Sequence, residues 1–316
     1  MGTFIDHLRR GTVRGISGFF WILKILIPVS FFTFVLQASG LLARMDFLLV
    51  PIMGWIHLPP EAALPLIIGI LTGIYGAIAA MAVLPLAEGQ MILIAIFLLI
   101  SHALIQEGII QGKSGMSALK ATLVRLSASV VTVLAVAPFL TLPPLGESAA
   151  AALTVVAVPF LSACRQWAGE MAWLCLKILF IVTALMVVLE LMKAYRLIDD
   201  ALRLISPLLR LLGLSDTVGM MWLAAAIFGI SYGGAVIVEE SRTGRIPAGE
   251  LDRLHLSIGI NHAMVEDPAL FLILGLPAFW LWVPRLVAAV VAVHLAAGLM
   301  WLKRRVVPAV ANDSQI

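Results

Sequence analysis

The sequence has few charged residues and almost no cysteine. Only 12% of its 316 residues are Asp, Glu, Lys or Arg, about half the share in a soluble domain, whereas 62% are hydrophobic. No sizeable polar stretch separates the apolar runs, which excludes a soluble catalytic domain within this sequence. The net charge of +3 is too small to indicate a nucleic-acid partner.

Metal and redox motifs are also missing. The two cysteines, Cys164 and Cys175, form neither a zinc nor a thiol redox signature, and we expect them to serve as small packing residues. No His-Glu-x-x-His motif is present. No cofactor is therefore expected, and whether a metal binds is left open.

Long apolar runs are what the sequence does have. Several approach or exceed the roughly 20 residues that cross a bilayer. We therefore expect an all-α polytopic membrane protein with about 8–10 transmembrane segments in two tandem repeats, with broken helices. The first run follows Arg9, Arg10 and Arg14 and is expected to be a span rather than a removed signal peptide. The runs are Phe19 to Leu36, Ala63 to Leu86, Met91 to Ile105, Ala172 to Leu189 and Ala278 to Leu302.

One short polar motif occurs twice inside these runs. Ser-His-Ala-Leu-Ile-Gln-Glu begins at Ser101, and Asn-His-Ala-Met-Val-Glu-Asp begins at Asn261, 160 positions later. The same offset relates Arg125 to Arg285, so we interpret the chain as a tandem duplication. The expected division is a basic amphipathic N-terminal segment (1–18), repeat 1 (19–140), a connecting segment (141–170), repeat 2 (171–302) and a polar tail (303–316).

The charges of the two repeats give conflicting indications of their orientation. Each repeat contains a proline-interrupted amphipathic piece, Met45 to Leu58 or Leu197 to Leu214, and we expect the piece in repeat 2 to lie along the membrane surface. The loop after the first span holds only Arg44 in repeat 1 but several basic residues in repeat 2, which favours inverted repeats. Basic residues at both termini instead favour the cytoplasmic side for both ends of the chain, which requires an even number of spans. Two repeats of four spans and one connecting span make nine, so this arrangement does not satisfy all charges.

The polar motifs predict where the chemistry lies. His262 and Glu266 are four residues apart and are expected to share a helix face, as are His102 and Gln106. A helix break is predicted at Glu107-Gly108 and Asp267-Pro268. Arg125 and Arg285 follow the histidines by 23 positions and are either snorkelling residues or ion partners of the acids.

Glycine-rich stretches in the second spans predict either close helix approach or local unwinding. Glu239 follows the glycine-rich turn of repeat 2 and lies either in a solvated loop end or, if the turn folds back into the membrane, beside His262. Repeat 2 is expected to supply most of the charge. The predicted substrate or ion-binding residues are His262, Glu266, Asp267, Asn261, His102, Glu107, Gln106, Tyr232, Gly233, Gly234, Tyr75 and Glu239.

The run from Gly229 to Ala235, together with Asn261 to Pro268, resembles the nucleoside recognition, or gate domain, family of bacterial inner-membrane proteins. That family resembles, more distantly, the spore maturation membrane proteins, the gate segments of ferrous iron transporter B and the concentrative nucleoside transporters. The resemblance implies a multi-pass protein of the bacterial inner membrane with a transport or gating role. It does not fix the substrate, because the GTP-binding domain of the iron transporter and the cysteines of its gates have no counterpart here.

We expect a secondary transporter or translocase of a small polar solute or ion, not an enzyme, with a polar site between the repeats near the bilayer midplane. A proton or cation would couple through Glu266, Asp267 or Glu107. One alternative is a membrane metalloenzyme with His262, Glu266 and His102 as metal ligands, and another is a non-transporting subunit of a larger membrane assembly. Membrane lipid is an expected partner, and a homo-oligomer is left open.

Overall fold

A computed structural model describes residues 4–39, 46–144, 160–195, 197–241 and 246–310, and within these ranges every regular element is a helix. Five helical stretches within these ranges are long and apolar enough to cross a membrane. The chain is thus a membrane protein with several apolar helices, and the all-α class is confirmed. The total of about 8–10 spans stays a prediction. The five stretches are Phe4–Ala38, Glu88–Lys113, Ala118–Phe139, Phe160–Met192 and Ala278–Leu299.

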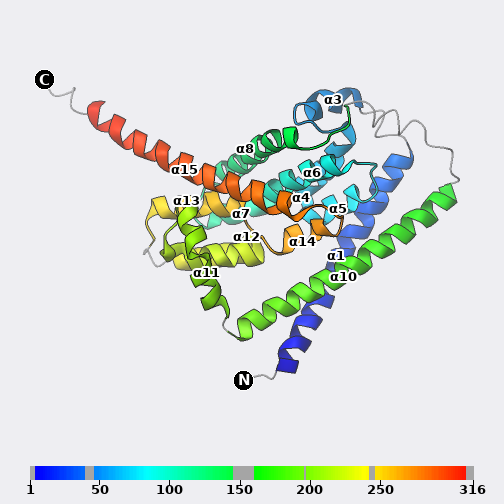
Figure 1. Ribbon diagram of the computed structural model, residues 1–316, viewed down its shortest axis with the longest axis horizontal. Helices are drawn as coiled ribbons and strands as arrows, with labels where there is room; N and C mark the ends of the chain where they lie inside the picture. Colours follow the sequence, from blue (N-terminus) through cyan, green and yellow to red (C-terminus); the bar gives the residue numbers. More distant parts are fainter. Residues whose placement is uncertain (1–3, 40–45, 145–159, 196, 242–245, 311–316) are drawn as a thin grey trace.

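The described elements follow the same order in the two halves of the chain (Figure 1). The first half contains α1 (Phe4–Ala38), α3 (Asp46–Gly54), η1 (Pro60–Ala62), α4 (Ala63–Thr72), α5 (Ile74–Met81), α6 (Glu88–Ser101), α7 (Leu104–Lys113), α8 (Ala118–Val136) and η2 (Ala137–Phe139). The second half contains α10 (Phe160–Ala194), α11 (Leu197–Leu211), η3 (Asp216–Val218), α12 (Gly219–Ser241), α13 (Ala248–Ile260), α14 (Glu266–Leu272) and α15 (Ala278–Val310).

Three of the four expected domain boundaries fall within helices, and the fourth, at residue 140, directly follows η2. Helices α1, α10 and α15 run without interruption across the boundaries at residues 18, 170 and 302. Residues 145–159 of the connecting segment, residues 311–316 of the tail and Arg44 lie outside the described ranges. The expected amphipathic pieces are helical in α3 and α11, and the position of the repeat 2 piece along the membrane surface stays a prediction.

The first long helix of each half runs in the opposite direction to the other. Near the start of α1, Arg14 forms an ion pair with Glu190 near the end of α10. Farther along α1, the hydroxyl of Ser30 accepts a hydrogen bond of 3.0 Å from Trp167 Nε1, near the start of α10. Successive contacts along α1 therefore move backward along α10, and the two helices cross as an antiparallel pair (Figure 1).

Glycine sets how closely α1 and α10 approach. A Cβ atom on Gly11 would lie 2.6 Å from the Cα of Val187, and one on Gly15 would lie 2.5 Å from the Cα of Thr183. These are distances to backbone, which cannot rotate away. Small residues at a helix crossing are a common means of association in lipid, because they let backbones meet.

A second pair of helices is broken at glycine. Gly73 separates α4 from α5 with φ 102°, and Gly229 interrupts α12 with φ 77°. Only glycine takes such positive φ values without steric cost. Of the two readings offered by the sequence, close approach and local unwinding, the structure shows unwinding at these two positions. The breaks also explain why the apolar helices Pro60–Thr72 and Asp216–Ile230 are shorter than a full span.

The third helices are broken as well, one residue after each histidine. Ala103 and Ala263 have left-handed φ values of 45° and 44°. The amide of Ala103 donates to Gly69 O at 2.9 Å, and the amide of Ala263 donates to Ala225 O at 3.0 Å. Each break in a third helix is therefore hydrogen-bonded to the second helix of the same half, just before that helix is broken at Gly73 or Gly229. The geometry recurs almost unchanged in the two halves.

The predicted break position was wrong by about one helical turn. Glu107 and Gly108 lie inside α7, and Asp267 and Pro268 lie in the first turn of α14. Proline is tolerated there because the first amides of a helix have no intrahelical acceptor. Gly108 instead permits close packing, since a Cβ on it would lie 3.1 Å from Thr122 Oγ1.

The predicted glycine-rich turn at the end of the second span was also wrong. Helix α12 continues through Gly233 and Gly234 as far as Ser241. A Cβ on Gly233 would lie 2.5 Å from the Cα of Ala225, in the part of α12 that precedes the break. These glycines allow contact between helices rather than a reversal of the chain.

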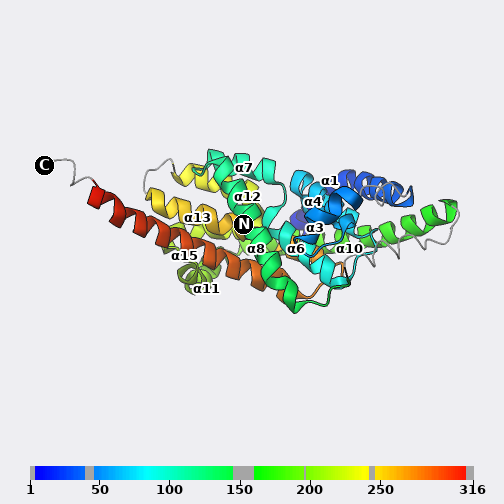
Figure 2. The same cartoon turned by 90° about the horizontal axis from the view of Figure 1, so that it is seen from above.

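The broken helices occupy the middle of the molecule. Figure 2 shows α15 extending to one end and α10 with α1 to the other, with α6, α7, α8, α12 and α13 between them. Helix α6 is buried along most of its length, including Leu93, Ile94 and Leu98 at 0% exposure. The polar site therefore begins where the most enclosed helix ends.

Candidate functional site

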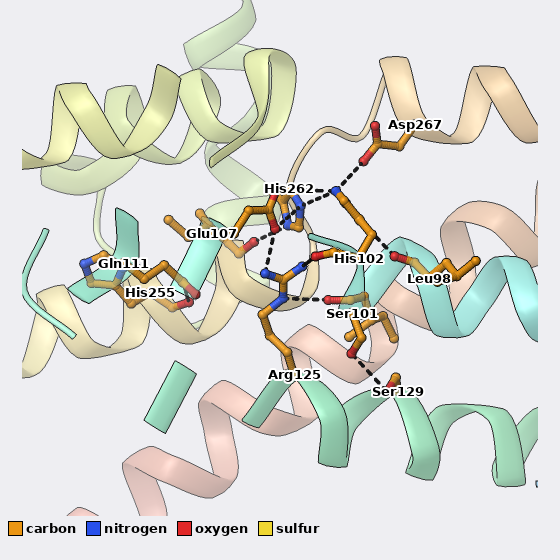
Figure 3. A network of polar contacts seen from close by, with 12 residues as sticks. Leu98, Ser101, His102, Glu107, Gln111, Arg125, Ser129, His255, His262 and Asp267 are labelled. Carbon is orange, nitrogen blue, oxygen red and sulfur yellow. Dashed lines mark hydrogen bonds and ion pairs between the residues drawn. The ribbon is translucent and has the colours of Figure 1, made fainter. Parts of the chain in front are cut away.

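Two buried histidines from opposite halves of the chain meet at the helix breaks (Figure 3). His102 follows the last residue of α6, and His262 lies just beyond α13. Their side chains point toward one another, with 3.4 Å between the two Nε2 atoms and 4.9 Å between the ring centroids. Both are buried, at 6% and 0% exposure. The two copies of the polar motif therefore meet at one place in the structure.

The backbone decides which nitrogen of each ring carries hydrogen. His102 Nδ1 lies 2.8 Å from Leu98 O, and His262 Nδ1 lies 2.8 Å from Ile258 O. A carbonyl oxygen only accepts hydrogen bonds, so Nδ1 must donate in both rings. In the neutral imidazole, Nε2 then offers a lone pair. Two lone pairs consequently face each other across the 3.4 Å gap.

Two carboxylates converge on the same point. Glu107 places Oε1 3.4 Å from His102 Nε2 and Oε2 3.3 Å from His262 Nε2. Asp267 places Oδ2 3.5 Å from His102 Nε2. Both acids are more than nine-tenths buried. We refer to His102, His262, Glu107 and Asp267 as the acceptor cluster, because with neutral rings and ionised acids none of the facing atoms can donate.

Arg125 supplies fixed positive charge to the first half of the site. Its Nη1 lies 2.6 Å from Glu107 Oε2, while Nε donates to Ile100 O at 2.7 Å and Nη2 donates to His102 O at 2.8 Å. Arg125 is only 1% exposed, so it is an ion partner and not a snorkelling residue. Its two backbone bonds hold the broken end of α6 against α8.

Arg285 occupies the equivalent position with fewer partners. It is also 1% exposed, and its Nη2 donates to His262 O. Its Nε and Nη1 atoms have no hydrogen-bond acceptor among the described residues. The snorkelling interpretation is therefore wrong for this residue too, although it forms no ion pair within the described part of the chain.

Glu266 and Gln106 do not share a face with the histidines. Because α13 ends at Ile260 and α14 begins only at Glu266, the expected four-residue spacing no longer applies. Glu266 instead accepts a hydrogen bond from the hydroxyl of Tyr75, on α5 of the other half. Gln106 is exposed. The acid five residues after each histidine, Glu107 or Asp267, is the one that reaches the cluster.

The other predicted residues have different environments. Asn261 is fully buried, and its side-chain amide has no hydrogen-bond partner among the described residues. Glu239 is exposed near the end of α12, and the side chain of Tyr232 lies outside the described residues. The expectation that repeat 2 supplies most of the charge was wrong, because Glu107 of the first half contacts both histidines.

Sequence reasoning did not identify one further polar contact between the halves. Gln111 Nε2 donates to His255 O at 3.1 Å, and His255 Nε2 donates to Ser114 O at 2.9 Å. These bonds join the end of α7, the helix that carries Glu107, to α13, the helix that precedes His262. The available signal was the position of His255, which lies two helical turns before His262.

Comparison with known proteins supports the resemblance drawn from the motifs. Residues 19–164 match the Gate family, described as "Nucleoside recognition". The chain is also 25% identical over 287 residues to a Bacillus subtilis protein described as "Uncharacterized membrane protein YvoD", covering 89% of this chain and 90% of the relative. No solved structure matches the chain. Resemblance to the gate family is therefore confirmed for its first half.

Proposed function

We propose that this protein is a secondary transporter or translocase of the bacterial inner membrane, moving a small polar solute or ion, and that it is not an enzyme. The acceptor cluster carries the proposal. Its four side chains come from both halves, lie at helix breaks and are buried in a chain rich in apolar spans. Acidic groups at bilayer depth are costly and usually mark ion or substrate pathways.

The arrangement of the halves supports the same proposal. Transporters commonly consist of two repeats of inverted topology, with the binding site formed by discontinuous helices at the repeat interface. Here the equivalent helices α1 and α10 cross in antiparallel fashion, as inverted repeats require (Figure 1). Unwound backbone at membrane depth is tolerated where protein encloses it, as at Ala103 and Ala263.

The site is suited to a cationic species. The converging acceptor atoms of these four side chains repel one another unless a proton or a metal ion lies between them. Because Glu107 comes from α7 and Asp267 from α14, a cation bound here holds the two halves together. Loss of the cation removes that link between the halves. Cation occupancy is then coupled to the relative position of the halves, and this coupling is what transport of a small polar solute requires.

Vesicle flux measurements test the proposal. Purified protein is reconstituted with an internal pH-sensitive dye, and proton, cation and polar-solute gradients are imposed in turn. We expect flux that falls about tenfold or more in Glu107→Gln, equivalent to about 1.4 kcal/mol. Glu88→Gln is the matched control, because Glu88 is exposed at the other end of the same span. Equal flux in both variants, or no flux across the screen, would overturn the proposal.

One observation favours the alternative of a non-transporting subunit. An apolar groove of about 670 Å³ lies between α8 and α15, away from the acceptor cluster, and includes Leu123, Val131, Val287 and Leu295. Lipid chains or an apolar partner helix can fill such a groove. Under this alternative, His262→Ala and Glu266→Gln leave function intact, whereas polar substitutions in the groove abolish it.

A further inference from the structure

The donor atoms of the acceptor cluster are those of a transition-metal site. Two imidazole nitrogens and carboxylate oxygens suit zinc and its first-row neighbours, whereas calcium and magnesium prefer oxygen alone. His102, Glu107 and His262 each present one such atom, with all three atoms within 4.8 Å of one another. The third ligand is Glu107, a residue that the sequence alone did not single out for this role.

The spacing of the two imidazole nitrogens matches a tetrahedral ion. With metal–ligand bonds of about 2.0–2.1 Å, neighbouring ligand atoms in a tetrahedral site are about 3.3–3.4 Å apart. The two Nε2 atoms are 3.4 Å apart, which is the separation of neighbouring ligands on one such ion. Glu107 offers one oxygen to each ring, with Oε1 3.4 Å from His102 Nε2 and Oε2 3.3 Å from His262 Nε2.

The surrounding groups already hold the ligands in metal-binding orientation. Metal-bound histidines usually donate their second N–H to a carbonyl, and bound carboxylates usually accept a further hydrogen bond. His102 and His262 both donate Nδ1–H to carbonyl oxygens at 2.8 Å. Arg125 engages one oxygen of Glu107 at 2.6 Å and leaves the other oxygen available.

An unsatisfied acid provides an independent indication. Asp267 is 8% exposed, and its Oδ2 has no hydrogen-bond donor among the described residues, although it lies 3.5 Å from His102 Nε2. A buried carboxylate without a donor is expensive. Glu107 has Arg125 as its ion partner, whereas Asp267 forms no ion pair with a guanidinium group among the described residues. A buried acid without a basic partner favours a cation.

We propose that the acceptor cluster binds one transition-metal dication of the zinc class, with His102 Nε2, His262 Nε2 and Glu107 as ligands and Asp267 as the fourth. This inference deepens the proposed function, on which it rests, by naming the cation of its site. Because two ligands come from each half, the bound ion bridges α7 and the helix breaks of both halves.

Cobalt(II) is the probe for this site, because tetrahedral Co²⁺ has distinctive visible absorption. The full chain in detergent micelles, stripped by chelator, is titrated with Co²⁺ and then with Zn²⁺. We expect one tetrahedral Co²⁺ per chain, displaced by Zn²⁺. His102→Gln is expected to weaken binding at least about tenfold. His294→Gln is the matched control, because His294 is an exposed histidine on α15, and it should bind Co²⁺ as the unaltered chain does.

A second variant guards against loss of fold. If His102→Gln is not monodisperse, Asp267→Asn is measured instead, with the loss of tetrahedral absorption as the expected result. Absence of stoichiometric Co²⁺, or equal binding in the cluster variant and in His294→Gln, would overturn the metal site. Flux measured in the same preparation separates the two proposals. Glu107-dependent flux without metal binding refutes only the metal, whereas metal binding without flux refutes only transport.

Discussion

The two halves of the site share a backbone but differ in how their charges are satisfied. Each half has a histidine beside a left-handed alanine and an arginine that donates to that histidine's carbonyl. In the first half, Arg125 also engages Glu107, whereas in the second half the guanidinium of Arg285 retains unused donors. The two halves therefore share a backbone arrangement, but the donors of Arg125 are used by Glu107 and two carbonyls, whereas two donor atoms of Arg285 have no acceptor among the described residues.

Removing each arginine should give the largest contrast. Arg125→Ala leaves Glu107 buried without its ion partner and is expected to destabilise the protein by about 3–5 kcal/mol. Arg285→Ala removes only a donor to one carbonyl, with an expected loss of about 1–3 kcal/mol. The measurement is the denaturant midpoint in detergent micelles.

A double variant identifies the source of the larger loss. Glu107→Gln combined with Arg125→Ala should be more stable than Arg125→Ala alone, because the neutral amide needs no ion partner. Equal losses for the two arginines would show that the halves are electrostatically equivalent.

A smaller effect is expected where the halves cross. Gly15→Ala introduces a Cβ at 2.5 Å from the Cα of Thr183, which forces α1 away from α10. The expected loss is about 1–3 kcal/mol. Gly18→Ala is the control on the same helix, because its Cβ would meet only Val182 Cγ1 at 3.9 Å. Thermal unfolding of the two variants in micelles should differ, and identical curves would rule out close packing at Gly15.

Substituting the glycines at the helix breaks should give the smallest loss of stability, and the loss should be similar in the two halves. Gly73→Ala and Gly229→Ala each place a side chain at positive φ, for an expected loss of about 1–2 kcal/mol. Both positions have room for a methyl group, so the loss reports backbone strain alone. Gly249→Ala in helix α13 should be neutral or stabilising by up to about 1 kcal/mol. A loss confined to one half would show that only one break is structurally required.

Much of the architecture was predictable because duplication leaves a regular record in the sequence. The offset of 160 positions identified the paired histidines, and their contact follows when the repeats pack against each other. The glycine stretches indicated unwinding of the second helices without fixing the residue. Buried arginines 23 positions after each histidine were recognised as candidate ion partners.

The details of the site depended on backbone conformations with no local signal. Nothing about Ala103 or Ala263 predicts a left-handed residue, because alanine normally favours a helix. That single conformation moves the break by a turn and directs Glu107 and Asp267 to the cluster in place of Gln106. Tertiary hydrogen bonds to Gly69 O stabilise it in the first half, and helical periodicity cannot anticipate such bonds.

The crossing of α1 and α10 has a consequence for synthesis of the chain. The partner of Arg14, Glu190, lies 176 residues later in the sequence. At about 5–20 residues per second, α1 waits about 10–35 s in the insertion machinery or the lipid before that partner is translated. Its glycine face and its arginine are uncovered throughout this interval. A translation product that stops short of α10 therefore lacks both the acidic partner of Arg14 and the helix that packs against Gly11 and Gly15.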